Sequence, residues 1–455
     1  MTAVKPVASK LQANDLDAGG DIEGAATTAW PDAAWWRLYG DPQLNRLIEE
    51  AVAGSPRIAA AQARIRVAQG MASISDAALQ PSIEGGADID RTRFSHDYYI
   101  PEDINGHYLF RPVWNNSAGL TLAYSFDFWG RDRAALEASL GQVKVSEYEA
   151  QNARLTLQGT VIRTYAELEY AYEIEDHERA ILDAEKQTLD LAARRLQAGL
   201  GTELEIQQAR NAVAATEAQL EEVANHRVLL RHQLAALGGR GPGAGDAITR
   251  PAMILNQVVG LPSRIPAELI GRRPDVQAER WRVEVAAKQI VVAKAAFYPN
   301  VDLKASLGLV GIGFGQLLSA SAVSSSIGPA VTLPIFEGGK LRAGLDVRTS
   351  QYDLAVDAYN AAVIEALRQV ADGISHLASL ETLRQRRAQT LSYANRAHEL
   401  AVIAFRAGLT DYNNVLSTED ALNRAQTLIA EIGLQQITSM SALNEALGGG
   451  LQVSP

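Results

Sequence analysis

Cysteine is absent from the 455 residues of the chain. Disulfide bonds, thiolate nucleophiles and cysteine-ligated metal centres are therefore excluded. Basic residues are outnumbered by acidic ones: the chain has 42 Lys and Arg and 53 Asp and Glu, which gives a formal net charge of -11. A nucleic-acid-binding protein usually carries a basic face, so this balance argues against nucleic acid as a partner.

Long apolar runs are missing as well. No window of about 18 consecutive apolar residues occurs, which argues against a transmembrane helix. The N-terminal stretch MTAVKPVASKLQANDLDAGG lacks the hydrophobic region of a signal peptide, so we expect a cytosolic chain or one whose leader has been trimmed. A closed β-barrel gives a much weaker sequence signal, so a membrane-spanning protein of that kind remains open.

Proline is absent between Pro112 and Pro242 and again between Pro334 and Pro455. Proline breaks helix interiors, so both blocks are free to be helical. Both are rich in Ala, Leu, Glu, Gln and Arg, which are strong helix formers. Each block therefore predicts long helix.

Each block breaks once, at a glycine that suits the position just after a helix end: Gly199 in QAGLGTELE and Gly408 in RAGLTDYNN. The segment TELE, 202–205, predicts a capping box that begins the next helix. Thr410 or Asp411 is expected to cap the corresponding helix in the second block.

Two helical hairpins follow from these breaks, about 131–237 and about 340–447. Their ascending arms, near 131–198 and 340–407, are about 67 residues long, which at a rise of 1.5 Å per residue is about 100 Å. Helices of that length are outside the globular norm and indicate a coiled coil or a tube.

The sequence also repeats itself. SPRIAAAQARIRVAQG matches RPDVQAERWRVEVAAK, and both Pro56 and Pro81 recur 218 residues later. Gly199 recurs 209 residues later, so the first copy has the longer loop between these anchors, at HDYYIPEDINGHYLFRP. We interpret the chain as a tandem duplication.

The predicted domains follow from this duplication. They are an N-terminal extended, equatorial segment, 1–40; a first repeat, 41–237; an equatorial linker rich in proline and glycine, 238–273; a second repeat, 274–447; and a C-terminal tail, 448–455.

Each repeat also predicts a β-hairpin, at about 81–128 and about 299–336. In each of its two strands, large apolar residues alternate with small or polar ones over about ten residues. The alternating apolar positions are Ile83, Ala87 and Ile89; Leu120, Leu122, Tyr124, Phe126 and Phe128; Val301, Leu303, Ala305, Leu307 and Leu309; and Ile327, Val331, Leu333 and Ile335.

Taken alone, each strand fits an ordinary soluble sheet, which is the commoner source of alternation. The long helices leave no separate layer to cover the apolar faces, and four strands cannot close a barrel. Three chains would supply twelve strands, enough to close one. Aromatic residues gather at both strand ends, as in the girdles of membrane barrels: Tyr98, Tyr99, Tyr108, Phe110 and Trp114 at one end, and Phe126, Phe128, Trp129, Phe297, Tyr298 and Phe336 at the other.

Several segments resemble one family, the outer membrane factors of tripartite efflux systems, which include the TolC-like and OprM-like channel proteins of Gram-negative bacteria. The resemblance covers about residues 30 to 450. The matching segments are WWRLYGDPQLNRLIEEAVAGSP (35–56), LPSRIPAELIGRRPDVQAERW (261–281), AFYPNVDL (296–303), PIFEGGKLRAG (334–344) and RAGLTDYNNVLSTEDAL (406–422).

The resemblance implies an α+β membrane protein that forms a TolC-like homotrimer. Four strands per chain would share one 12-stranded transmembrane β-barrel in the outer-membrane lipid, and the long helices would form an α-helical barrel, a tunnel through the periplasm. Such a channel conducts drugs or other solutes passively from an inner-membrane transporter of the RND, MFS or ABC class through a periplasmic adaptor protein, and confers multidrug resistance. Many OprM-like members carry a lipidated N-terminal cysteine, which this chain lacks.

The same resemblance implies the functional residues of the duct. It needs no catalytic residue, cofactor or metal. A gate at the periplasmic tip would contain Asp411, flanked by Arg406 and Tyr412; three Asp411 carboxylates near the axis would repel one another and attract cations. Cap statistics equally allow Asp411 to be only an N-cap, and Arg406 to be a solvated surface residue. The adaptor-docking tips would contain Gly199, Leu200, Thr202, Gly408 and Leu409.

On the lipid-facing side of the barrel we expect Leu120, Leu122, Tyr124, Phe126, Leu303 and Leu307. The lumen-facing residues between them would be Thr121, Ala123 and Ser125.

The alternative to a duct is a structural coiled-coil protein with a small soluble sheet. An enzyme has little support, because the seven histidines are scattered without metal-ligand spacing. The stretch GLVGIGFG, 308–315, lacks the following helix of a dinucleotide-binding loop and is better explained as a strand end.

Overall fold

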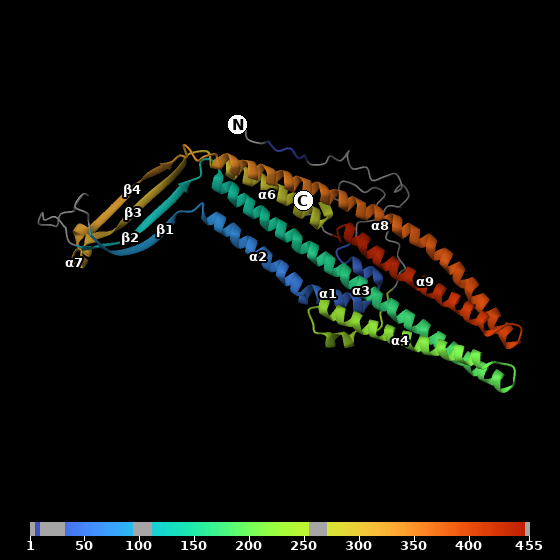
Figure 1. Cartoon of the computed structure of the whole chain (residues 1–455). Coiled ribbons are helices and arrows are strands. Elements are labelled where there is room, and N and C mark those ends of the chain that lie inside the picture. The colour runs from blue at the N-terminus through green and yellow to red at the C-terminus, as the bar shows by residue number, and fades with distance from the viewer. Residues whose placement is uncertain (1–4, 10–31, 94–111, 254–270, 451–455) are drawn as a thin grey trace. The chain divides into compact units, whose positions relative to one another are not determined.

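The computed structural model describes residues 5–9, 32–93, 112–253 and 271–450. Its helices are η3 (Trp35–Tyr39), α1 (Pro42–Gly54), α2 (Pro56–Ala77), α3 (Arg131–Gln197), α4 (Glu203–Leu237), η4 (Pro242–Ala247), α6 (Pro274–Ala295), α7 (Phe314–Leu317), η5 (Ala320–Ala322), α8 (Lys340–Arg406) and α9 (Tyr412–Ala446) (Figure 1). Its strands are β1 (Ser82–Thr92), β2 (Val113–Phe126), β3 (Asn300–Ile312) and β4 (Val323–Thr332). None of the described helices is both long enough and apolar enough to cross a membrane.

The tandem duplication is confirmed by the lengths of the paired helices. Helices α2 and α6 both have 22 residues, α3 and α8 both have 67, and α4 and α9 both have 35. Residues 10–31, 254–270 and 451–455 lie outside the described part of the chain. The predicted boundaries of the N-terminal segment, the linker and the C-terminal tail therefore stay predictions.

The strands form one antiparallel sheet in the order β1-β2-β3-β4. The central pair, β2 with β3, joins the two repeats, and β1 and β4 are the edge strands. Two predicted strand ends were wrong. The second strand was expected to reach Phe128, but the Phe128 N–H donates to the Phe126 carbonyl at 2.8 Å and the chain turns there. The fourth strand was expected to include Leu333 and Ile335, but it ends at Thr332, just before Pro334, which has no N–H to donate.

The chain divides into two compact units, and the first contains residues 1–10, 65–145 and 279–358. This unit holds the sheet and the helix segments next to it in sequence. Its small buried residues Ala68 and Ala72 on α2 contact Val143 on α3. On the same part of α3, a methyl group at Gly141 would lie 2.7 Å from Val285 on α6. Small residues therefore let these helices pack closely.

The second unit contains residues 11–64, 146–278 and 359–455. Its main core places Trp35, Leu44 and Ile48 against α3 and α4, with Tyr165 fully buried. Asp41 ties this core together, because its carboxylate accepts hydrogen bonds from the Gln43 N–H, the Tyr165 hydroxyl and the Ala252 N–H. One buried carboxylate thus caps α1 and ties it to α3 and to Ala252 in the predicted linker.

Candidate functional site

The two faces of the sheet differ in polarity, as the alternation predicts. On one face, Leu120 pairs with Leu307, Leu122 with Ala305 and Tyr124 with Leu303. Leu120 and Leu307 are 55% and 59% exposed, so this apolar face has no cover from the described chain at its centre. Contact of these side chains with lipid stays a prediction.

The opposite face carries small and polar residues. Thr121 pairs with Ser306, and the Ser306 hydroxyl lies 2.8 Å from that of Ser326 on β4. At the middle of this face Gly119 pairs with Gly308, and a methyl group at Gly119 would lie 2.9 Å from the Gly308 Cα. The face expected to line a lumen is therefore polar, and its two central strands meet there without side chains.

Aromatic rings are grouped where the strands meet the helices. Trp129 stacks on Tyr298 with ring centres 4.5 Å apart, and its indole N–H donates to the Pro299 carbonyl at 2.9 Å. Phe126 stacks on Phe128 at 5.7 Å. At the other end of the sheet Trp114 contacts Phe314 of α7. The remaining residues of that expected girdle, Tyr98, Tyr99, Tyr108 and Phe110, lie outside the described residues.

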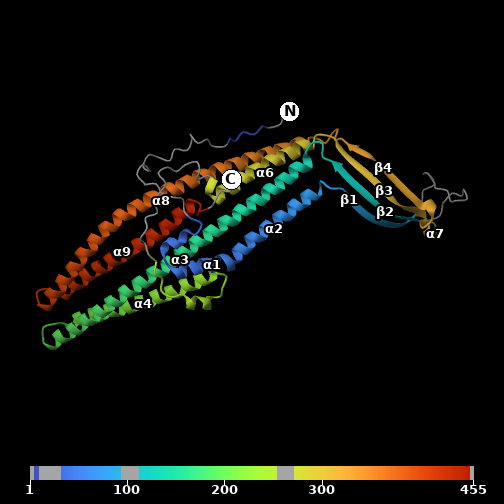
Figure 2. The same ribbon diagram turned by 180° about the vertical axis from the view of Figure 1, so that it is seen from behind.

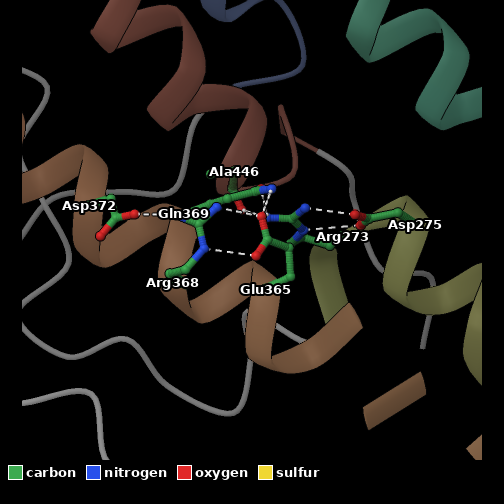
Figure 3. Close-up of polar contacts among 7 residues, drawn as sticks. All are labelled: Arg273, Asp275, Glu365, Arg368, Gln369, Asp372 and Ala446. Atoms are coloured by element: carbon green, nitrogen blue, oxygen red, sulfur yellow. Dashed lines mark hydrogen bonds and ion pairs between the residues drawn. The ribbon is translucent and has the colours of Figure 1, made fainter. Parts of the chain in front are cut away.

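The RRPDVQAE segment forms a polar node at the start of α6 (Figure 3). Arg273 is buried, and its Nη2 and Nε donate to the two carboxylate oxygens of Asp275 at 2.6 and 3.0 Å. Its Nη1 donates to the side-chain oxygen of Gln369 at 2.9 Å and to the Ala446 carbonyl at 3.3 Å. A positive charge is favourable there, because Ala446 is the last residue of α9.

Helix α8 supplies the second half of this node. Glu365 accepts two hydrogen bonds from Arg368, at 2.6 and 2.8 Å, and one from the Gln369 amide at 2.9 Å (Figure 3). These bonds lower the pKa of Glu365 to about 2. The node therefore joins the start of α6, the middle of α8 and the end of α9.

The two hairpins bend at residues 198–202 and 407–411, which we call the hairpin tips. Both bends lie at the same end of their hairpins in Figures 1 and 2. Gly199 and Gly408 each adopt a φ of 73°. In both tips the N–H of this glycine and the N–H of the leucine after it donate to carbonyls of the preceding helix, which is the hydrogen-bond pair of a Schellman motif. The predicted capping box of Thr202 and Glu205 is confirmed.

A small hydrophobic cluster holds the tips together. It contains Ala209 of α4, Ala401 and Phe405 of α8, and Tyr412 and Val415 of α9, with Leu189 of α3 packed against it. All four long helices contribute, so the two hairpins share one core close to their tips.

The three predicted gate residues lie at the second tip but in different surroundings. Asp411 is exposed, and its carboxylate caps α9 by accepting from the Asn414 N–H at 3.2 Å, so its capping role is confirmed. Arg406 is exposed and lines a cavity of about 220 Å³ beside Asp190 and Arg194. Tyr412 is 1% exposed and packs on Phe405, and its hydroxyl has no partner among the described residues. Their part in a gate stays a prediction.

The predicted docking residues are at the surface of the tips. Leu200 and Leu409 are 72% and 81% exposed, although both are apolar. Gly199, Gly408 and Thr202 shape the backbone that presents them. Two exposed leucines at equivalent positions of the repeats are an apolar surface without a partner in the described chain.

Sequence reasoning missed two buried carboxyl groups between the hairpins. Glu185 of α3 and Glu419 of α9 are 6% and 7% exposed, and Thr216 of α4 donates a hydrogen bond to Glu185. Burial, with the charge of Glu185 nearby, raises the pKa of Glu419 to about 7. Burial likewise raises the pKa of Glu185.

A signal for these carboxyls existed. Glu419 follows Tyr412 and Val415 at the spacing of an apolar helix face, and Glu185 stands four residues after Ile181 and four before Leu189. Arg195 was missed for another reason: its Nη1 donates to the Phe405 carbonyl on the other hairpin at 2.8 Å, a contact 210 residues away in sequence.

The described residues contain no cluster of three or more His, Asp or Glu side chains that could hold a metal ion. The sheet and the hairpin tips each present exposed apolar side chains instead.

Comparison with known proteins decides the family. The family model described as outer membrane efflux protein matches residues 47–240 and 265–449. The chain belongs to the outer membrane efflux protein family. It is an efflux channel of the outer membrane that extends into the periplasm, with a TolC-like fold.

Individual relatives agree with this membership. The outer membrane protein VceC of Vibrio cholerae has a solved structure with a TM-score of 0.85 and 33% identity, covering 93% of this chain and 100% of that one. The multidrug resistance outer membrane protein MdtQ of Escherichia coli O157:H7 is 31% identical over 94% of this chain and 90% of its own length. The fusaric acid resistance protein FusA of Burkholderia cepacia is 44% identical over 75% of this chain but only 64% of its own length. The family and these relatives are channel and resistance proteins rather than enzymes.

Proposed function

We propose that three copies of the chain form the passive exit duct of a tripartite efflux pump. The observation that carries the proposal is the four-stranded sheet, which has one apolar face and two edge strands, β1 and β4. Backbone N–H and C=O groups without hydrogen-bond partners are too costly in lipid, so both edge strands must pair with other strands. Pairing β1 of one copy with β4 of the next, three times, closes a barrel of about 12 strands, a usual size for an outer-membrane barrel.

The long hairpins extend this duct into the periplasm. Helices α3 and α8 have 67 residues each, which at 1.5 Å per residue is about 100 Å. With three copies, α3, α4, α8 and α9 supply the walls of the tunnel. The hairpin tips form its narrow end, where Asp411, Arg406 and Tyr412 make the gate.

An adaptor protein of the periplasm is the proposed partner at the tips. The exposed Leu200 and Leu409 give it two equivalent apolar contacts per chain, and apolar patches at element ends commonly mark protein interfaces. Through the adaptor the duct serves an inner-membrane transporter of the RND, MFS or ABC class. Two relatives are named for resistance to fusaric acid and to multiple drugs, which supports compounds of this kind as the cargo.

Conduction is measured with purified protein in planar bilayers. Docking is measured as drug resistance in cells whose own outer-membrane channel is deleted. Wild-type protein is expected to form pores and to restore drug resistance with its pump. Leu409→Asp is expected to keep the pore conductance but to lose resistance, because a charge on the docking surface opposes apolar contact. Absence of pores would refute the duct, and full resistance with the variant would refute docking at this residue.

A further inference from the structure

Two arginines stand apart on the apolar face of the sheet. The register aligns one set of alternate positions on that face, which on β1 runs from Ile83 to Ile89. The next position of this set on β1 is Arg91, and Arg93 follows at the one after, just past the end of the strand. Among the described residues of the four strands, no other position of this face carries a charged side chain.

The acidic residues of the same strand lie on the opposite, polar face. Glu84, Asp88 and Asp90 occupy the positions between the apolar ones, and they pair in register with small and polar residues of β2. In the part of the chain that the structure describes, neither Arg91 nor Arg93 forms an ion pair with an acidic side chain. Although the whole chain is acidic, this rim of the apolar face is therefore purely basic.

An aromatic ring holds Arg91 in place. Arg91 pairs in register with Trp114, and its guanidinium carbon lies 5.8 Å from the centre of the indole ring. Trp114 in turn contacts Phe314 of α7, with ring centres 5.6 Å apart. Contact with a ring face orients a guanidinium group without using its N–H donors. The exposed Arg91 therefore presents these donors to an acceptor outside the described chain.

The position of the two arginines along the sheet matches the level of lipid headgroups. β1 follows α2 and β2 leads into α3, so Arg91 and Trp114 lie at the end of the sheet away from these helices. Trp114 is 12 residues from Phe126 on β2, about 40 Å at 3.4 Å per residue. A strand tilt of about 40° reduces this length to a height of about 30 Å, the thickness of the hydrocarbon core of a bilayer.

The chemistry of the arginines suits phosphate. A guanidinium group binds a phosphate group through two parallel hydrogen bonds and always keeps its charge. Basic side chains close to an anionic membrane surface are attracted to its headgroups. The outer leaflet of an outer membrane consists largely of glycolipids that carry phosphate groups. An acidic residue on this face would oppose their binding, and the described positions contain none.

We propose that Arg91 and Arg93 form a binding site for the phosphate groups of outer-leaflet glycolipids, at the outer rim of the apolar face of the sheet. This inference rests on the proposed function, because only a sheet that spans the outer membrane with its helices in the periplasm places these arginines in that leaflet. The acyl chains of the same lipid lie beside apolar residues such as Ile89, which is 57% exposed. A trimer holds three such sites.

Binding is measured on detergent-purified trimers titrated with bis-phosphorylated lipid A, with bound lipids counted by native mass spectrometry. Wild-type protein is expected to retain up to three lipid A molecules per trimer. Lipid A without its phosphates is expected to bind about tenfold more weakly or worse, because the arginines lose their acceptors. Phosphatidylglycerol, with one phosphate and no sugar, is expected to bind more weakly than bis-phosphorylated lipid A. The interaction is exposed, so added salt is expected to weaken it.

Two double variants assign the binding to these residues. Arg91→Gln with Arg93→Gln removes both charges and is expected to lower the affinity for bis-phosphorylated lipid A by about tenfold or more. Arg64→Gln with Arg66→Gln is the matched control, because these two exposed arginines of α2 have the same spacing and the same charge. The control is expected to bind lipid A like wild type.

Equal affinity of wild type and the Arg91→Gln, Arg93→Gln variant would overturn the site. So would equal binding of lipid A with and without phosphate by wild-type protein, a comparison that needs no substitution. Equally tight binding of phosphatidylglycerol would overturn the assignment to glycolipid. The lipids are counted whether or not the protein conducts. Pores without lipid selectivity refute the site alone, whereas absence of pores refutes the duct.

Discussion

Asp411 has one role in the structure and a second in the proposed duct, and substitution can separate the two. Its carboxylate caps α9, and in the proposed trimer it also places three negative charges near the axis. Asp411→Asn keeps the cap and removes the charge, whereas Asp411→Ala removes both and is expected to cost about 1 kcal/mol of stability from the lost cap. Both variants are expected to raise single-channel conductance and to weaken cation preference. If Asp411→Asn conducts like wild type, Asp411 is only a cap.

Arg273 is the residue whose loss should harm the second unit most. It is buried and binds Asp275, Gln369 and the Ala446 carbonyl, so Arg273→Ala leaves several polar groups without partners. Asp275 has a side chain that is 36% exposed, and it keeps the hydrogen bond from the Val276 N–H, so we expect a cost of about 1–3 kcal/mol, mainly from the Gln369 and Ala446 oxygens that lose their donor. A marked fall of the thermal midpoint in detergent is expected. Arg280→Ala, at an exposed position of α6, is the control, and equal midpoints for the two variants would contradict a structural node.

Local contacts were predictable from the sequence at this scale, and distant ones were not. The capping roles of Thr202 and Asp411 depend on residues within one helical turn, so the sequence shows them directly. Arg195 and Arg273 depend on partners 210 and 96 residues away, which no local pattern reveals. The burial of Tyr412 also depends on packing against another helix.

At the scale of the helices, the pair of carboxyls between the hairpins makes stability depend on pH. The folded state raises the pKa of Glu419 from its ordinary 4.5 to about 7, so folding favours its protonated form. The contribution of Glu419 to the stability of the folded state is therefore full below about pH 4.5, and it is lost as the pH rises through about 7. We expect the hairpins to be less stable at about pH 8 than at about pH 5, measured as thermal unfolding in detergent.

Glu419→Gln isolates this effect, because it keeps the shape of the side chain without its charge. The variant is expected to be more stable than wild type at about pH 8 and to differ little at about pH 5. His398 of α8 has a pKa lowered by burial and therefore acts in the opposite direction, losing stability at low pH. The Lys186–Glu217 ion pair between α3 and α4 is present in both the wild type and the Glu419→Gln variant, so its effect on stability drops out of the difference between them. A constant difference between variant and wild type at every pH would contradict the assignment.

Helix positions were well predicted because proline and glycine mark where a helix stops. The arms expected near 131–198 and 340–407 are α3 and α8, and the breaks fall at the expected glycines. Strand ends were predicted less well, since alternation continued past the turn at Phe128 and past Pro334. Alternation reports which side a residue faces, but it does not report where the ladder of hydrogen bonds ends.

At the scale of the whole molecule, the sheet is incomplete in one chain. Its apolar face is exposed, and its two edges expose backbone groups of β1 and β4. Both deficits disappear if three copies close a barrel in lipid, with no change in any strand. The sequence predicted the family and the number of strands per chain. The trimer was also expected from the sequence, whereas the strand order that leaves β1 and β4 as the two edges appears only in the structure.

Direct imaging of the detergent-extracted particle, with its protein mass measured in parallel, tests the trimeric duct most directly. The proposal predicts a hollow particle with three-fold symmetry, a protein mass of three times 48.9 kDa, and a helical tunnel of about 100 Å below the barrel. A protein that is monodisperse and monomeric in plain buffer, without detergent, would contradict it.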